Sequence, residues 1–396
     1  MTIARIACLM IALLAAGSAW SRDEAVGIED LRAFADAWGY IKDHYVEEVD
    51  DRQLMEAAIR GMLSELDQHS GWLSQDELAA LEEDATGRYG GLGVRIAVQE
   101  QYLQVISALG DSPAERAGLK AGDRIVAIDQ KPLDATNAGE ATGWLRGPPG
   151  TLVALTVERD GVDERLELDL TREIIFRRSV SLETLPDGFA HVQIASFQQS
   201  TATELDEALD ELAALPDSPS GLILDLRDNP GGMLVAAVAV SDRFLSDKLV
   251  VYAESRGDGQ ELRLTTNPGE KLADVPMIVL VNGTSASAAE IVAGALQDHG
   301  RAIVLGERTY GKGSVQTIWP LRNGGGIRLT TSHYHTPSGR MLNGKGIVPD
   351  VVQGSMRPAD ALAGDEVLTQ IDPPVIEAMM LFRNAERLYQ GSGRLD

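Results

Sequence analysis

The sequence predicts a multidomain α/β protein with an N-terminal helical segment, a β-rich module and a layered α/β core. Three changes in the spacing of apolar residues predict this order. Over residues 28–84 they recur at every third or fourth position, which is typical of amphipathic helices. Between 85 and 172 the period falls to two, which favours short strands. Over 173–352 apolar strands alternate with helical stretches, as in a layered α/β core.

The composition limits the classes of partner. The chain has 396 residues, enough for two or three domains, with 35 Lys and Arg against 60 Asp and Glu and a net charge of −25. Such a surface repels polyphosphate and anionic lipid, so nucleic acid is not expected as a partner.

The first 19 residues have the pattern of a secretory signal peptide. Arg5 precedes an apolar stretch, 6–16, that is too short to cross a bilayer, and Gly-Ser-Ala at 17–19 is a small-x-small cleavage pattern. We therefore expect an exported, periplasmic protein, with an uncleaved membrane anchor as the alternative. The single cysteine, Cys8, lies in this segment, so the mature chain would contain no thiol and no disulfide.

The individual elements follow the same periods. In the helical segment a Ser-Gln-Asp-Glu stretch at 74–77 is a typical helix start. The β-rich module has strand-like runs at 92–98, 102–107, 124–129, 152–158 and 164–170, and short helices at 113–118 and 136–145. The core has strands at 190–196, 221–226, 276–282, 302–306, 315–319 and 326–331, and helices at 201–214, 233–245 and 285–298. A tail, 353–396, carries a helix around 374–390.

Two candidate sites are weak. The segment beginning at Gly306 almost matches a phosphate-binding loop, but Gly313 separates Lys312 from the hydroxyl that would hold Mg²⁺. His333 and His335 place two imidazoles on one face of a strand, yet no cysteine or HExxH motif accompanies them, so we predict no metal site. A Ser-His-Asp triad using any of the six histidines stays formally open.

A stronger candidate lies between a predicted buried strand and a predicted helix, in Asn282-Gly-Thr-Ser-Ala-Ser-Ala-Ala-Glu290. Its small residues let a substrate backbone approach, and the turn presents a hydroxyl at a helix N-terminus. The free N–H groups and the helix dipole there favour developing negative charge. Because serines are also ordinary helix caps, a role that suits Ser285, this motif alone does not identify a nucleophile.

Motifs on both sides of this segment make the candidate specific. Tyr310-Gly-Lys-Gly313 lies downstream of Ser287, Gln316 follows it, and Asp225-Leu-Arg-Asp-Asn-Pro-Gly-Gly232 lies upstream at the end of a strand. This set resembles the C-terminal processing (tail-specific) serine peptidases, and the resemblance covers residues 30–352.

The resemblance includes a PDZ-like module, marked by Gly90-Gly-Leu-Gly93 and Ser112–Asp123, and an Asp-Gln-His-Ser element at 67–70. The family usually has a serine where this chain has Ala289, which leaves the catalytic set intact. Asp298 matches an acid once implicated in the family, and we interpret it as structural support.

The resemblance implies a ClpP/crotonase-like serine peptidase core with Ser287 as nucleophile, Lys312 as general base and Gln316 assisting the lysine. Burial disfavours an ammonium ion and lowers the pKa of lysine from about 10.4, so a neutral Lys312 amine can take the serine proton. Backbone N–H groups would stabilise the oxyanion, one from Gly231 or Gly232 and one from Ala288. This chemistry requires no metal or cofactor.

The PDZ-like module is expected to select protein substrates by their C-termini. A free carboxylate would bind the backbone of a glycine-rich turn while the peptide adds as a strand. The predicted substrate-binding residues are Gly90, Gly91, Leu92, Gly93 and Val94. The family is thought to use a PDZ arginine near the position of Arg146 to couple this module to catalysis, and Arg146 is therefore a predicted regulatory residue.

Two other functions compete with this one. A degenerate peptidase could act only as a binding adaptor, but the intact Ser287, Lys312 and Gln316 disfavour it. An enoyl-CoA hydratase-like enzyme would also use paired oxyanion N–H groups, but a signal peptide and a PDZ-like module disfavour that reading. The sequence leaves the substrates, a possible adaptor protein and a possible homo-oligomer open.

Overall fold

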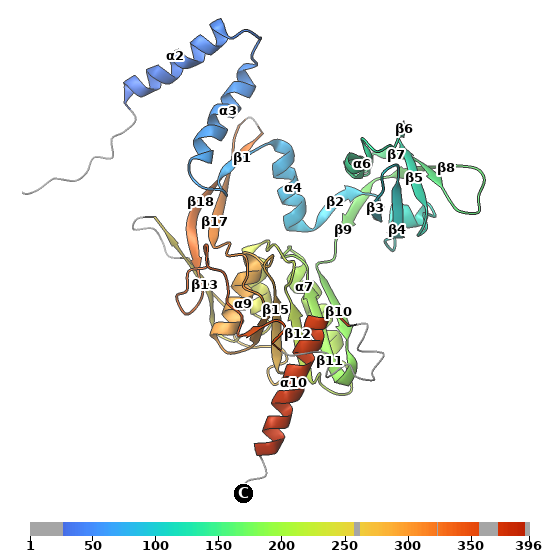
Figure 1. Cartoon of the computed structure of the whole chain (residues 1–396), viewed down its shortest axis with the longest axis vertical. Coiled ribbons are helices and arrows are strands. Elements are labelled where there is room, and N and C mark those ends of the chain that lie inside the picture. Colours follow the sequence, from blue (N-terminus) through green and yellow to red (C-terminus); the bar gives the residue numbers. More distant parts are fainter. Residues whose placement is uncertain (1–26, 257–261, 323, 356–370, 393–396) are drawn as a thin grey trace, which may run out of the picture. The chain divides into compact units, whose positions relative to one another are not determined.

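The computed structural model describes residues 27–256, 262–322, 324–355 and 371–392 (Figure 1). The chain divides into two compact units, Met1–Leu66 and Asp67–Asp396. The described part of the first unit consists of helices α2 (Ile28–His44) and α3 (Asp51–Ser64), as the apolar period predicted. The predicted signal peptide lies outside the described residues.

The second unit begins with a short strand, β1 (Gly71–Leu73), and helix α4 (Gln75–Thr86). The predicted helix start is a capping box, in which Glu77 N–H donates to Ser74 Oγ at 3.1 Å and Ser74 N–H donates to the Glu77 carboxylate at 2.6 Å. The sequence did not predict β1, because a strand of three residues is too short to show a period.

The β-rich module is an antiparallel sheet in the order β3-β4-β5-β7-β8, with the short β6 beside β5. Its strands are β3 (Val94–Val98), β4 (Leu103–Ala108), β5 (Arg124–Ile128), β6 (Lys131–Pro132), β7 (Leu152–Glu158) and β8 (Leu166–Thr171), and its helices are α5 (Pro113–Arg116) and α6 (Ala138–Trp144). The five longer strands and both helices confirm the elements predicted from the sequence. A two-stranded ribbon of β2 (Arg88–Gly91) and β9 (Glu173–Phe176) brackets the module.

The core is built on a six-stranded sheet in the order β10-β11-β12-β15-β16-β19, parallel except for the β10–β11 pair. Its strands are β10 (Val180–Thr184), β11 (Phe189–Ile194), β12 (Gly221–Asp225), β15 (Met277–Val281), β16 (Ile303–Gly306) and β19 (Val351–Val352), and a short 3₁₀ turn covers Pro186–Gly188. Its helices are α7 (Thr201–Ala213), α8 (Leu234–Ser241), α9 (Ala288–Asp298) and α10 (Pro373–Ser392).

Both faces of the central strands are buried, which explains their continuous apolar runs. Leu222 and Val279 pack in the cluster that contains α7, α8 and α9. The alternate residues Ile223 and Leu280 pack against α10, where Phe382 stacks on Phe189 with 5.3 Å between ring centroids. Because β12 and β15 are parallel neighbours, their carboxyl ends lie side by side at one edge of the sheet. Ligands bind at this edge in open α/β sheets.

A second sheet has the order β1-β18-β13-β14, with β17 on β18. It contains β13 (Leu249–Ser255), β14 (Leu262–Thr265), β17 (Ser314–Pro320) and β18 (Gly326–His335). Neither β13 nor β14 was predicted, because both lie in a stretch that we left unassigned between the helix at 233–245 and the apolar strand at 276–282. Helix α9 begins at Ala288, three residues later than the prediction, because the preceding loop has non-helical geometry.

Candidate active site

The loop between β15 and α9 is held by a serine that we predicted to be a helix cap. Ser285 Oγ donates to the carbonyl of Leu226 at 2.7 Å and accepts from Asn282 N–H at 2.9 Å. It therefore ties the loop to the end of β12, and the residue at the N-cap position of α9 is Ser287. The capping prediction for Ser285 was wrong, because a buried carbonyl competes for its hydroxyl.

Ser287 has an unusual backbone conformation, with φ 55° and ψ −113°. A non-glycine residue at positive φ costs about 1–3 kcal/mol and persists only where the surroundings enforce it. Here the N–H of Ser287 donates to Glu290 Oε2 at 2.8 Å, which helps to hold the residue at the start of α9. This backbone conformation places the Ser287 hydroxyl at the N-terminus of α9.

Glu290 connects the loop of Ser287 to the loop of Lys312. Its side chain has no exposed surface. Oε2 accepts from the N–H groups of Ser287 and Lys312, both at 2.8 Å, and Oε1 accepts from Thr309 Oγ1 at 2.5 Å and Gly311 N–H at 2.7 Å. One buried carboxylate therefore fixes the backbone of both predicted catalytic residues. We did not single out Glu290 from the sequence, although the Ser-x-x-Glu spacing of a capping box marks it.

Lys312 lies on the loop between β16 and β17. Burial lowers the pKa of its amine, and the positive charge of Arg328 lowers it further. In the described residues no hydrogen bond joins Lys312 Nζ to Ser287 Oγ. The amide nitrogen of Gln316 donates to Ser314 Oγ at 2.7 Å and lies 3.4 Å from Thr330 Oγ1, rather than binding the lysine.

Gly231 and Gly232 differ in their hydrogen bonds. The N–H of Gly231 donates to Asn229 Oδ1 at 2.8 Å, while those of Gly232 and Ala288 have no partner in the described part of the chain. A Cβ on Gly231 would lie 2.8 Å from Ser287 Cβ, and one on Gly232 would lie 2.1 Å from the carbonyl oxygen of Phe197. Both positions therefore require glycine.

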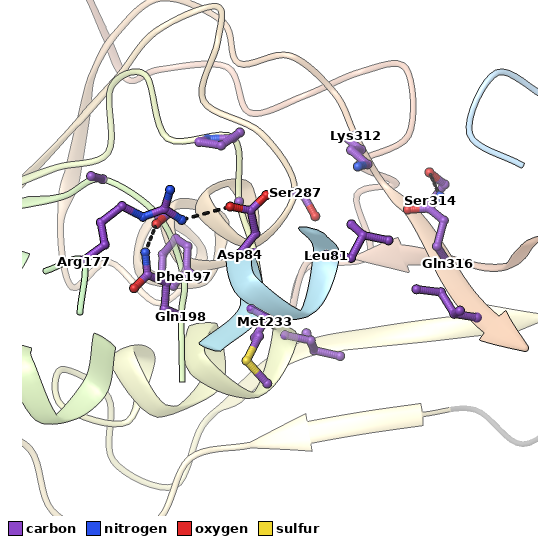
Figure 2. A pocket seen from close by; sticks show the side chains of 18 of the residues that line it. Leu81, Asp84, Arg177, Phe197, Gln198, Met233, Ser287, Lys312, Ser314 and Gln316 are labelled. Atoms are coloured by element: carbon purple, nitrogen blue, oxygen red, sulfur yellow. Dashed lines mark hydrogen bonds and ion pairs between the residues drawn. The ribbon is translucent and has the colours of Figure 1, made fainter. Parts of the chain in front are cut away.

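Ser287 and Lys312 both line one cavity of about 800 Å³. Figure 2 shows the Ser287 and Lys312 side chains on neighbouring parts of its wall, together with Leu81 and Asp84 of α4 and Gln316 of β17, which also line it. The apolar part of the wall includes Phe197, Met233, Leu234 and Ile318. The predicted residues Gly231, Gly232 and Gln316 also line this cavity.

A second cavity, of about 340 Å³, lies in the β-rich module. It is lined by Tyr89, Gly91, Leu92, Gly93, Val94, Ile96, Thr142, Gly143, Leu145 and Arg146. The predicted Gly90 is not part of this lining, and a Cβ there would lie 2.0 Å from the carbonyl oxygen of Gly147. The N–H groups of Leu92 and Gly93 have no partner among the described residues.

Arg146 bridges this second cavity and α4. Its guanidinium lies 4.7 Å from the ring centroid of Tyr89 and 3.7 Å from the Glu83 carboxylate. Glu83 is in the helix whose Leu81 and Asp84 line the first cavity.

The six histidines and Asp298 are not among the residues that line the first cavity. His191 Nε2 lies 3.0 Å from the Asp225 carboxylate, and His335 is buried and stacks on Tyr252 with 4.9 Å between ring centroids. Asp298 pairs with Arg340 and accepts from Ser338 N–H at 2.8 Å, in keeping with a structural role.

The comparisons with known proteins agree with this architecture. A model of peptidase family S41 matches residues 188–353, a PDZ domain model matches 105–159, and a model of the N-terminal domain of the activating protease CtpB matches 14–76. The carboxy-terminal-processing protease of Bartonella bacilliformis is 39% identical over 342 residues, which is 86% of this chain and 79% of that protein. This chain belongs to the C-terminal processing serine peptidases.

A further relative supports this assignment, and a solved structure shares the fold. The carboxy-terminal processing protease CtpA of Bacillus subtilis is 34% identical over 317 residues, or 80% of this chain and 67% of that protein. A solved S41 protease of Bacteroides fragilis has the same fold, with a TM-score of 0.52, 17% identity, and coverage of 86% of this chain and 94% of that one. The chain is therefore a serine peptidase that acts on protein substrates and carries a PDZ domain. Its described helices are each too short or too polar to cross a membrane.

Proposed function

We propose that this peptidase uses Ser287 as nucleophile and Lys312 as general base. The observation that carries the proposal is that both side chains line one cavity while the buried Glu290 carboxylate binds the backbone N–H of both residues. A lysine acts as a base only when it is neutral, and burial together with Arg328 lowers its pKa.

The proposed reaction moves one proton back and forth. Ser287 Oγ attacks the substrate carbonyl carbon as its proton passes to Lys312 Nζ, and the ammonium then protonates the leaving amine. A water molecule hydrolyses the acyl-enzyme by the same route in reverse. Catalytic hydrogen bonds are often long before substrate binds, so the absence of an Oγ–Nζ bond is compatible with this sequence of steps.

The oxyanion of the tetrahedral intermediate would accept from Gly232 N–H and Ala288 N–H. Within the described ranges neither donor has a partner, whereas Gly231 N–H is already bound to Asn229. Each donor of this kind is worth about 3 kcal/mol of barrier. The role of Gly231 would be to let the turn approach Ser287 closely.

Gln316 would assist by accepting from the Lys312 amine. Its amide nitrogen is engaged by Ser314 and Thr330, which leaves the amide oxygen as the acceptor on the same wall of the cavity.

The test is hydrolysis of an unstructured protein by the wild type and by Ser287→Ala, Lys312→Ala and Lys312→Arg. Nucleophile and base act as one unit, so each alanine variant should lose at least about 10⁴-fold in kcat. The arginine variant should fail too, because a guanidinium keeps its proton. Circular dichroism and thermal unfolding should match the wild type, and an active Lys312→Ala enzyme would contradict the assignment.

The PDZ domain would select substrates by their C-termini. The N–H groups of Leu92 and Gly93 have no partner in the part of the chain that the structure describes and can bind a carboxylate, which the positive charge of Arg146 in the same cavity favours. Contacts of Arg146 with Tyr89 and with Glu83 of α4 support the predicted coupling of this domain to catalysis.

We also propose that the enzyme is exported and cleaves envelope proteins. The support is the signal-peptide pattern of residues 1–19, and N-terminal sequencing of the secreted protein tests it. A mature chain should begin near Trp20, whereas a chain that begins at Met1 or Thr2 would indicate an anchor. An adaptor protein and a homo-oligomer stay predictions.

A further inference from the structure

Residues 67–70, Asp-Gln-His-Ser, form a turn that the proposed mechanism does not use. Asp67 Oδ1 accepts from the N–H groups of His69 at 2.7 Å and Ser70 at 2.8 Å, and Oδ2 accepts from Ser70 Oγ at 2.9 Å. Burial acts to raise the pKa of Asp67, but these hydrogen bonds outweigh it and hold that pKa below its ordinary value. An ionised carboxylate therefore fixes the shape of the turn.

The turn is bound to strand β18 at two alternate positions, 328 and 330. Arg328 Nε donates to the carbonyl of His69 at 2.9 Å, and Thr330 N–H donates to Ser70 Oγ at 3.1 Å. The next residue, Gly71, pairs with Arg328 at the start of β1. These contacts join parts of the chain that are about 260 residues apart, and they hold the Arg328 side chain and the Thr330 backbone.

Thr330 carries this link to the catalytic cavity. It pairs with Gln316 across the β17–β18 ladder, beside a register shift between Val315 and Gln316. Gln316 Nε2 lies 3.4 Å from Thr330 Oγ1 and 2.7 Å from Ser314 Oγ, and both Gln316 and Ser314 line the cavity. A β-bulge re-aims the side chains next to it, so the position of Thr330 helps to decide where Gln316 points.

Arg328 carries the link to Lys312. Its positive charge acts on the pKa of both Lys312 and His69, and the charge of Lys312 acts in turn on His69, whose pKa is lowered first by burial and then by that lysine. The third ionisable group beside Lys312 is Glu290, which binds its backbone N–H. The carbonyl of His69 therefore holds the guanidinium of Arg328, the cation that disfavours the ammonium form of Lys312.

We propose that the Asp67–Ser70 turn positions the general base by binding Arg328 and Thr330, which hold a cation near Lys312 and keep Gln316 on the cavity wall. This inference rests on the proposed role of Lys312. The four residues of the turn are positioning residues, because none of them lines the cavity.

The test compares Ser70→Ala with Ser70→Thr, which retains the hydroxyl, in the full chain. Ser70→Ala should lower kcat about tenfold at neutral pH with little change in KM, because a small displacement of a catalytic group is costly. Ser70→Thr should restore most of the rate. A general loss of packing would lower the unfolding temperature and would not be rescued in this way.

The pH profile of kcat distinguishes positioning of the general base from a purely structural role of the turn. The neutral amine is the active form, so activity is present above the pKa of Lys312 and lost as the pH falls through it. Arg328→Gln removes a charge that lowers this pKa, so the acid limb should move to higher pH by about half a unit. Arg322→Gln, which removes an exposed arginine at the tip of the same hairpin, is the matched control and should leave the profile unchanged.

Wild-type kcat in Ser70→Ala, or an unmoved acid limb in Arg328→Gln, would overturn the inference. Either result would leave the proposed catalytic pair intact, whereas an active Lys312→Ala enzyme would overturn the pair itself. If Ser70→Ala fails to fold, Arg328→Gln still tests the link from the turn to Lys312, because it changes no residue of the turn itself.

Discussion

The peptidase core and the PDZ domain each present unpaired backbone N–H groups next to a glycine with restricted surroundings. In the core they belong to Gly232 and Ala288, and in the PDZ domain to Leu92 and Gly93, among the residues that the structure describes. A Cβ on Gly232 would lie 2.1 Å from a carbonyl oxygen, and one on Gly93 would lie 2.4 Å from the Cβ of Ser112. The two sites are alike in backbone and differ in what lies beside them.

The neighbouring side chain indicates which anion each site suits. Arg146 lines the PDZ cavity, and a permanent cation favours a permanent carboxylate. The core site has Ser287 and a lysine whose pKa is lowered, so it suits negative charge that appears only during reaction. Donors directed at a developing charge accelerate the chemistry, whereas donors directed at a stable charge contribute to binding.

Substitution of the two glycines should separate these roles most strongly. Gly232→Ala keeps the backbone N–H, but its Cβ would lie 2.1 Å from the Phe197 carbonyl oxygen, so the turn must move and the proposed oxyanion donor is displaced. We expect kcat to fall by about 10²–10³-fold, with a smaller change in KM. Gly93→Ala should raise KM for substrates with a free C-terminus and change kcat little. Gly139→Ala in α6, where an added Cβ meets nothing within 4 Å, is the control. A Gly232→Ala enzyme with a raised KM and an unchanged kcat would show that the core site, like the PDZ site, contributes only to binding.

Glu290→Gln should test how rigidly the core site is held. The amide NH₂ would face N–H or O–H donors in place of one carboxylate oxygen, so we expect kcat to fall by about 10²-fold. The free energy of unfolding should fall by about 2 kcal/mol, because buried donors lose their acceptor. The matched control is Glu307→Gln, which changes an exposed glutamate in the loop between β16 and β17. Wild-type kinetics in Glu290→Gln would show that the carboxylate is not needed to hold Ser287 and Lys312 in place.

Amidation of a substrate C-terminus tests whether the PDZ site binds the carboxylate. The amide removes the charge and keeps the side chains, so kcat/KM for an upstream cleavage should fall about tenfold, the value of one charge-assisted hydrogen bond. The Gly93→Ala enzyme should no longer discriminate between acid and amide. Equal cleavage of both forms by the wild type would rule out carboxylate recognition.

Arg146→Ala should have the smallest effect. If contact with Glu83 of α4 transmits PDZ occupancy, cleavage of a saturating substrate should slow by about two- to fivefold, as expected for a coupling free energy near 1 kcal/mol. Arg165→Ala, which removes an exposed arginine of the same domain, should have no effect. A wild-type rate for Arg146→Ala at saturation would limit its role to binding.

Local patterns in the sequence determined much of this protein. The capping box at Ser74 and Glu77, the apolar strand at 276–282 and the strands of the PDZ domain depend on residues that are neighbours in the chain, and period and composition report such contacts directly. The same local motifs, together with a family resemblance, brought Ser287 and Lys312 forward as candidates.

Only the tertiary structure decided how distant segments meet. Glu290 binds Lys312 N–H from 22 residues away, the His69 carbonyl binds Arg328 from 259 residues away, and β13 reaches its place by pairing with β18. No period records these contacts, because each is selected by packing and by the need of buried donors for acceptors. The same need placed Ser285 against the carbonyl of Leu226 rather than at the cap of α9.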